Sequence, residues 1–394
     1  MTQPNVSAST SPEAPPAPVE EAAVEAYQET EAQIMVASQW KLIWWKFRKH
    51  KLAMAAGLVV FAIYFIAAFA EFFEVIPPDQ YAANYTYAPP QTIHFIDTSN
   101  GTPKVGLYVN GYKSVIDSFS LRRTFTVDPE QKVPFRFFAQ GFEYKLLGLI
   151  PWDRHLIGPV NKDDPLYILG ADSLGRDLFS RLIAGGRISM SIGLLGVTIS
   201  LVLGILLGGL SGYYGGAIDN IIQRIIEFLR SLPTIPLWMS LAAALPVNWP
   251  ALNVYFGITL ILSFIGWTGL ARVVRGRFLA LREEDFVLAA RLDGAPQLYL
   301  IMRHMAPSFL SHIIASITLA IPGMILSETA LSFLGLGLRP PVVSWGVLLQ
   351  DAQNIRAVAT APWLLLPGLA VAVAVLSLNF LGDGLRDAAD PYGR

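Results

Sequence analysis

The sequence predicts an all-α protein that crosses a membrane several times and carries one polar insert. Of its 394 residues, 53% are hydrophobic and 15% are charged, and the hydrophobic residues come in long blocks. A helix needs about 20 apolar residues to cross the hydrocarbon core of a bilayer. Charge-free runs of that order occupy residues 52–70, 188–212, 232–271, 305–327 and 357–382. The chain is therefore expected to be a polytopic membrane protein.

The third of these runs is long enough for two short helices. Pro246 and Pro250 stand in its middle with an asparagine between them, and this is turn chemistry. We therefore expect six spans in all. The loop between the third and fourth spans contains no Lys or Arg, as expected for a loop outside the cytoplasm.

The N-terminal region changes character at residue 40. Residues 1–39 contain six Glu and neither Lys nor Arg, and they are rich in Pro, Ala and Ser, which favours a disordered acidic cytoplasmic tail. Residues 40–51 mix aromatic and basic side chains, which suits a helix lying in the headgroup region. Basic residues directly before the first span, 52–70, predict a cytoplasmic N-terminus.

Residues 71–168 are expected outside the cytoplasm as a small insert of mixed or β-rich structure. They are polar and rich in Tyr, Pro and Asp, and the stretches 92–96, 105–109 and 124–127 indicate strands between Gly, Pro and Asn residues. Two interpretations of the aromatic residues stay open, which are packing within a small domain and contact with a ligand. Residues 169–394 form the remaining unit, a core with the other five spans.

Opposite charges alternate in the loop before the second span. The segment Gly170 to Leu182 reads GADSLGRDLFSRL, and its carboxylates and arginines are close enough in sequence to pair at the membrane surface. The residues of interest in it are Asp172, Gly175, Arg176, Asp177 and Arg181. From the residues alone this is an ion-paired loop.

Small residues recur at every fourth position of the second span. They are Gly196, Ser200, Gly204, Gly208 and Gly212. Such a stripe allows helix backbones to approach closely and makes their packing specific. We expect it to face a neighbouring helix.

Two polar features lie near later spans. The stretch 219–230 is short and polar, so we expect it in the cytoplasm, with the third span beginning near Pro233. The fifth span leads to Glu328. A carboxylate at membrane depth is costly and usually functional. A cap on a helix near the outer surface accounts for Glu328 equally well, and both interpretations stay open.

The long polar interruption of the C-terminal half is residues 276–306. Arginines in and just before it indicate the cytoplasmic side. The acidic residues at 283–285 suit the first turn of a helix, and Gly294 favours a turn before a second helix. Ala289 and Ala290 are small and adjacent, so the backbone of another protein can approach there.

This loop resembles the EAA loop of ABC importer permeases, the coupling helix that docks into a groove of the ATPase subunit. The spacing Ala289-Ala290-x3-Gly294 and the closing Arg303-His304-x2-Pro307 are similar to that motif. The chain departs from it at two places, because Leu288 stands where the family usually has Glu and Met305-Ala306 replace an apolar pair.

Other segments carry the same resemblance in the same order. GADSLGRDLFSR, the LSFLGLG run ending at Gly337, and RDAADP near the C-terminus are similar to family blocks. The chain therefore resembles the second permease subunit of the dipeptide, oligopeptide and nickel importer family. Residues 134–156 look like the insert of its oligopeptide and microcin C branch.

The resemblance implies a type I ABC importer transmembrane domain in a bacterial inner (plasma) membrane, with six helices and both termini cytoplasmic. The implied partners are a homologous permease, two ATPase subunits or one two-domain ATPase, a solute-binding protein and a peptide-like cargo. Nucleic acid is not among them. ATP and Mg²⁺ would be bound by the ATPase subunits, so the chain itself is expected to bind no cofactor or metal and to be no enzyme. Nickel chelates or other small solutes are the alternative cargo.

The resemblance also assigns roles to residues. The implied ATPase-coupling set is Ala289, Ala290, Arg291, Asp293, Gly294, Arg303, His304 and Pro307. The loop around Asp172 becomes a candidate gate or contact for the binding protein, beside its interpretation as a simple ion-paired loop. The implied mechanism is alternating access driven by closure of the ATPases.

The composition excludes some chemistry and leaves two rivals. Without cysteine the chain forms no disulfide and no thiol-ligated metal site, and it has no GxxxxGK[ST] loop for ATP. A secondary transporter should show paired charges buried in several spans, whereas here the ionisable residues cluster at loops. A membrane anchor that only presents the insert leaves the loop 276–306 without a role.

Overall fold

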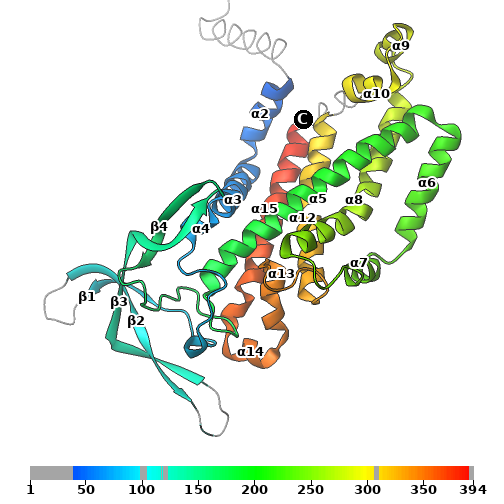
Figure 1. The fold of residues 1–394 in the computed structure, drawn as a ribbon. Coiled ribbons are helices and arrows are strands. Elements are labelled where there is room, and N and C mark those ends of the chain that lie inside the picture. Colours follow the sequence, from blue (N-terminus) through cyan, green and yellow to red (C-terminus); the bar gives the residue numbers. More distant parts are fainter. Residues whose placement is uncertain (1–38, 98–103, 117, 119–122, 306–309, 390–394) are drawn as a thin grey trace, which may run out of the picture.

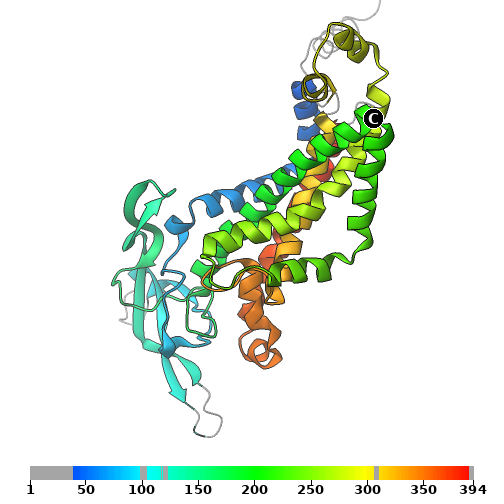
Figure 2. The same ribbon diagram turned by 45° about the vertical axis from the view of Figure 1, so that its right-hand side comes forward.

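The computed structural model describes residues 39–97, 104–116, 118, 123–305 and 310–389. They form an elongated helical body with a β-sheet at one end (Figure 1). The described chain begins and ends at the opposite end of this body, beside the projecting helices α9 and α10 (Figures 1 and 2).

Five helices are long and apolar enough to cross a membrane. They are α3 (Lys51–Ala68), α5 (Leu178–Tyr214), α8 (Ala251–Leu281), α12 (Leu310–Phe333) and α15 (Leu366–Ala389). Each of the five apolar runs of the sequence therefore contains or overlaps one of them. The sixth expected span is not confirmed as a single helix, because α7 (Thr234–Ala243) has only 10 residues.

The region between α5 and α7 is helical as well. Where the sequence suggested a short polar stretch, α6 (Gly216–Ser231) forms a helix of 16 residues and ends before Pro233. Ile222, Ile226 and Leu229 bury one face of α6 against the body. Helices α5 and α8 lie side by side and end at the same end of the body, so α6 and α7 carry the chain back between them (Figures 1 and 2).

The first helices pack against the last. Helix α2 (Gln39–Lys49) meets α3 at His50, whose Nδ1 accepts a hydrogen bond from the Ala53 amide at 3.2 Å. Phe47 and Ala53 are buried against Ala388 of α15. The basic and aromatic stretch is thus a helix, as expected, and it is anchored on the C-terminal helix.

The polar insert is a four-stranded antiparallel sheet in the order β1-β2-β3-β4. The strands are β1 (Ile93–Asp97), β2 (Lys104–Ile116), β3 (Arg123–Leu146) and β4 (Ile150–Pro159). In the register, Val109 pairs with Val133 and Ala139 with His155. The three expected strands are present, but β3 has 24 residues and β4 was not expected. The length of β3 allows it to pair with β2 at one end and β4 at the other.

Short helices complete the two ends. Near the sheet are α4 (Ala70–Phe73), η1 (Ala83–Tyr85), α13 (Trp345–Leu348), η3 (Leu349–Gln353), α14 (Ile355–Thr360) and η4 (Pro362–Leu365). At the other end are α9 (Asp285–Leu292), α10 (Gln297–Tyr299) and the π-helical turn η2 (Leu300–Met305). The main core lies between α5, α8, α12 and α15, with Ile192, Ile258 and Ile325 fully buried.

Candidate functional site

Helix α8 continues to Leu281, so the loop begins later than the expected residue 276, and residue 306 lies outside the described residues. Residues 282–305 fold as a helix, a turn and a second helical segment that project beyond the bundle (Figures 1 and 2). Gly294 has a φ of +82°, a left-handed conformation that L side chains rarely adopt, so the expected turn lies where the sequence placed it. Helix α9 begins at Asp285, after the acidic pair, and α10 begins after Pro296.

One side chain fastens α9 to the bundle. Val287 is 1% exposed and packs in a cluster with Val274 and Phe278 of α8 and with Ile301 and Met305 of η2. Because a single buried residue holds α9, its other faces stay uncovered. The tip of α9 is therefore a surface without a partner in the described chain.

Three large apolar side chains of this loop are exposed. Leu292 is 88% exposed, and Phe286 and Leu298 are exposed as well. Most of the expected coupling residues lie on this surface: Ala289, Arg291, Asp293, Gly294 and Arg303 are exposed, and Ala290 and His304 are half-buried. Pro307 lies outside the described residues. Large exposed apolar side chains at a projecting tip indicate a protein interaction site.

The loop before α5 closes on itself around Asp172. The Asp172 carboxylate accepts hydrogen bonds from Arg176 Nε at 2.6 Å and from the Leu174 amide at 2.9 Å. Arg181 Nε lies 3.3 Å from the same carboxylate as an ion pair without hydrogen-bond geometry. Gly175 has a φ of +73°, and a side chain there would collide with the carbonyl of Ala82. The four charged residues of the set are buried and turned toward one another or the chain.

Asp177 caps the N-terminus of α5 within this loop. Its carboxylate accepts hydrogen bonds from the amide and the hydroxyl of Ser180, at 2.8 and 2.6 Å. Burial raises the pKa of Asp177 to about 6, although these hydrogen bonds oppose the rise. The loop therefore fixes the end of α5 next to the insert.

The stripe of small residues on α5 faces other helices of the same chain. All five residues are buried. Gly208 lies against the backbone of Ala271 on α8, where an added Cβ would be 2.5 Å from the carbonyl oxygen. Gly212 is equally close to α8, and Gly196 lies against Met324 of α12. The stripe thus allows α5 and α8 to touch backbone to backbone.

Glu328 is the centre of a buried hydrogen-bond network. Its carboxylate accepts hydrogen bonds from Ser189 Oγ at 3.0 Å, Ser332 Oγ at 2.8 Å and Ser344 Oγ at 2.7 Å. The hydroxyl of Ser189 in turn accepts the amide of Trp345, so α5, α12 and α13 meet here. Glu328 lies within α12, five residues before its last residue, Phe333. Through these hydrogen bonds Glu328 joins α5, α12 and α13.

Two ion pairs between distant elements were not predicted from the sequence. Arg187 of α5 donates two hydrogen bonds to Glu71 of α4, and Arg275 of α8 donates two to Asp219 of α6. The partners are 116 and 56 positions apart in the chain. A lone charge at the edge of an apolar run is the only sequence signal of such pairs.

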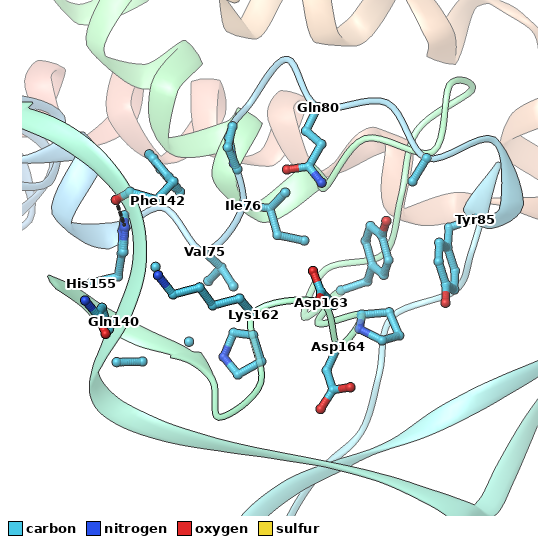
Figure 3. Close-up of a pocket in the computed structure, with 18 of the residues that line it drawn as sticks. Val75, Ile76, Gln80, Tyr85, Gln140, Phe142, His155, Lys162, Asp163 and Asp164 are labelled. Carbon is cyan, nitrogen blue, oxygen red and sulfur yellow. Dashed lines mark hydrogen bonds between the residues drawn. The ribbon is translucent and has the colours of Figure 1, made fainter. Parts of the chain in front are cut away.

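The insert contains a cavity of about 560 Å³ between β3, β4 and the segment after α4 (Figure 3). His155 and Phe142 lie at one side of it, with His155 Nε2 3.1 Å from the Phe142 carbonyl, and Lys162, Asp163 and Tyr85 lie around the rest. The rings of Tyr85 and Tyr167 are 5.0 Å apart, and both residues also line the cavity. Packing and contact with a ligand therefore both stay open as explanations of the aromatic content.

Comparison with known families supplies the class of protein. Residues 200–392 match the model of the binding-protein-dependent transport system inner membrane component, and residues 38–90 match the N-terminal TM domain of oligopeptide transport permease C. The chain belongs to this family of binding-protein-dependent transport permeases, as the resemblance predicted.

Several individual permeases are similar to more than half of this chain. The oligopeptide transport system permease protein OppC of Haemophilus influenzae is 40% identical over 229 residues, which cover 58% of this chain and 71% of that protein. OppC of Bacillus subtilis is 35% identical, covering 64% and 77%, and the dipeptide transport system permease protein DppC of B. subtilis is 38% identical, covering 56% and 68%.

A solved structure is also similar at low level. The inward-facing MetNI methionine ABC transporter aligns with 53% of this chain and 96% of its own chain, at a TM-score of 0.40 and 18% identity.

Proposed function

We propose that this chain is the transmembrane permease subunit of an ABC importer for peptides, and that it couples to ATPase subunits through residues 276–306. The peptide assignment rests on the oligopeptide and dipeptide permeases among its relatives. The observation that carries the coupling role is the projecting tip of α9, where Leu292 is 88% exposed. A groove on an ATPase subunit would cover this apolar surface.

The chain would form half of the translocation pathway. A homologous permease would complete it, two ATPase subunits or one two-domain ATPase would bind ATP and Mg²⁺, and a solute-binding protein would deliver the peptide. Closure of the ATPases would move α9. Helix α8 ends at Leu281, only a few residues before α9, so that movement would pass directly into the helical body.

We also propose six crossings, the third of which consists of α6 and α7 together. Helix α6 has 16 residues and is about 24 Å long at about 1.5 Å per residue, and α7, with 10 residues, turns away from its axis (Figures 1 and 2). Helix α6 alone therefore supplies most of the roughly 30 Å of the hydrocarbon core. The third crossing would therefore begin before residue 232, and residues 71–168 would lie outside the cytoplasm with both termini inside.

The loop around Asp172 would act at the outer end through α5. Its charged side chains are buried, so a direct contact with a binding protein would involve the exposed Leu174 beside them. Glu328 would keep α5, α12 and α13 together during the cycle through its three serine partners.

The test replaces Leu292 by Glu in the assembled importer. A charge at the centre of an apolar contact should release the ATPase subunits or abolish ATP turnover stimulated by the loaded binding protein. Gly294→Val should act in the same direction, because valine is strained at a φ of +82°. Leu288→Glu, which restores the usual family residue, should have a smaller effect.

Ile355→Glu is the matched control. Ile355 is 84% exposed on α14, at the opposite end of the body, so the same change of chemistry is made away from the proposed contact. The measurements are the ATPase content after purification and the stimulated turnover in nanodiscs. If Leu292→Glu and Gly294→Val match Ile355→Glu in both, the loop does not couple to an ATPase.

A further inference from the structure

A second cavity, of about 680 Å³, opens at the end of the helical body that carries the sheet. The segment after α4, the first half of α5, the first turns of α8 and the segment after α12 surround it. Ile188, Leu252 and Val342 represent its apolar walls, and Glu74, Asp79 and Arg187 are its charged residues. Its volume lies within the range of about 300–1,000 Å³ of small-molecule sites.

Glu74 is the unusual residue of this cavity. It is 4% exposed, and among the described residues none donates a hydrogen bond to its carboxyl group. Arg187, which lines the same cavity, is already engaged: it donates two hydrogen bonds to Glu71 and one each to the carbonyls of Ala67 and Ala68. A buried carboxyl group without a partner is costly. Because Glu74 lines the cavity, a partner for its carboxyl group would be water or a ligand held there.

The surroundings of Glu74 carry an excess of negative charge. Glu71 on α4, Asp79 on the following segment and Asp177 before α5 all act on it, and among the described residues Arg187 is the cation that opposes them. Tyr144 on β3 also lies within reach of this charge, because Glu74 is among the groups that raise its pKa, after burial. Burial and these carboxylates raise the pKa of Glu74 to about 8. About a tenth of the side chains would then be ionised at pH 7, unless a cation is placed beside them.

We propose that this cavity is a binding site for a protonated amine attached to an apolar body, with Glu74 as the anion that receives the amine. This inference rests on the proposed function, under which the amine is the N-terminal ammonium group of a peptide with apolar side chains. The carboxyl group supplies the opposite charge, and the walls around Leu252 and Val342 bury the apolar part. Binding would ionise Glu74 and release its proton.

The absence of cysteine from the chain allows a direct test of the local charge. Leu252 is 63% exposed at the cavity, so Leu252→Cys places one reactive thiol there. The importer is assembled with cysteine-free partner subunits in nanodiscs. The thiol is modified with a cationic and an anionic methanethiosulfonate of similar size. Because both reagents react with the same thiolate, the effect of thiol ionisation cancels in the ratio of the two modification rates.

We expect the cation-to-anion ratio to rise by about fivefold or more between pH 6.5 and pH 9, as Glu74 ionises. Glu74→Gln should remove this rise, and Glu74→Asp, which keeps the carboxyl group, should retain it. Glu130→Gln is the matched control, because it makes the same substitution at an exposed carboxylate outside the cavity, where water screens the charge. A rise that persists in Glu74→Gln would overturn the proposal.

A ligand experiment tests the amine on the same thiol. Trileucine should slow modification in the Leu252→Cys importer, whereas N-acetyl-trileucine should not, and neither should protect after Glu74→Gln. Equal protection by both peptides, or no modification of the thiol at all, would contradict an amine site. Subunit content and stimulated ATP turnover are measured on the same samples. If the subunits and the stimulated turnover are lost although the coupling loop is unchanged, the proposed importer function is wrong. If both are retained and the free amine gives no protection, only the amine site is wrong.

Discussion

The contact between Gly208 and Ala271 gives the sharpest test of how α5 and α8 pack. A methyl group on residue 208 would lie 2.5 Å from the Ala271 carbonyl oxygen and 2.8 Å from its Cα. These are backbone atoms, which cannot turn aside as a side chain can. The two helices would have to separate by nearly 1 Å, a gap that loses roughly a quarter to a half of the attraction at each affected contact.

The expected cost can be isolated with a second glycine. Gly269 lies on α8 itself, and a Cβ there would meet no atom within 4 Å. Both Gly208→Ala and Gly269→Ala gain the same helix propensity, about 0.5–1 kcal/mol. The difference between them therefore reports the clash, which we expect to be about 1–3 kcal/mol. Dispersion contacts dominate helix packing in lipid, so this loss has little compensation.

The assay is thermal unfolding of the purified importer in nanodiscs, followed by tryptophan fluorescence. Gly208→Ala should melt several degrees below Gly269→Ala, which should match or exceed the parent protein. Gly208→Leu should prevent recovery of the assembled complex. If Gly208→Ala and Gly269→Ala melt at the same temperature, the close approach of α5 and α8 is not a source of stability and the packing argument is wrong.

Two further predictions concern topology and pH. Single cysteines at Glu130 and Ile355 should react with an impermeant maleimide added to intact cells, and one at Gln297 should react only after permeabilisation; the reverse pattern would invert the proposed orientation. Because the folded-state pKa of Asp177 is raised from 3.8 to about 6, this residue should contribute most to stability below pH 4 and lose about 3 kcal/mol of that contribution as the pH rises to 6. Thermal midpoints from pH 4 to 7 should therefore fall less steeply in Asp177→Asn than in the parent protein, and equal slopes would refute this.

The parts of the fold that the sequence predicted are those with a strong periodic or compositional signal. Long apolar runs located the five membrane-length helices, because a segment of about 20 apolar residues finds its most favourable surroundings in the hydrocarbon core of a bilayer. The turn at Gly294 was also predicted, since glycine is the residue that best tolerates its left-handed backbone. In both cases local residues determine the structure.

The parts that were not predicted depend on residues far apart in the chain. Glu328 and Ser189 are separated by 139 positions, so the network that satisfies the carboxylate cannot be read from the neighbourhood of either residue. The extent of helix α6 was not predicted, because the charges of Arg224 and Glu227 set this stretch apart from the apolar runs, although its buried face follows a helical period. The unpartnered state of Glu74 likewise becomes visible only when Arg187 is seen to be occupied by Glu71.

The backbone contact at Gly208 should make α5 and α8 move together. No side chain stands between α5 and α8 at Gly208, so there is no rotamer whose change would let one helix slip past the other. Helix α5 has 37 residues and is about 55 Å long. A rotation of the pair by about 5° about the Tyr214 end of α5 would carry its Leu178 end through about 5 Å. A small displacement of α9 would thereby be enlarged where α5 meets Asp172 and the insert.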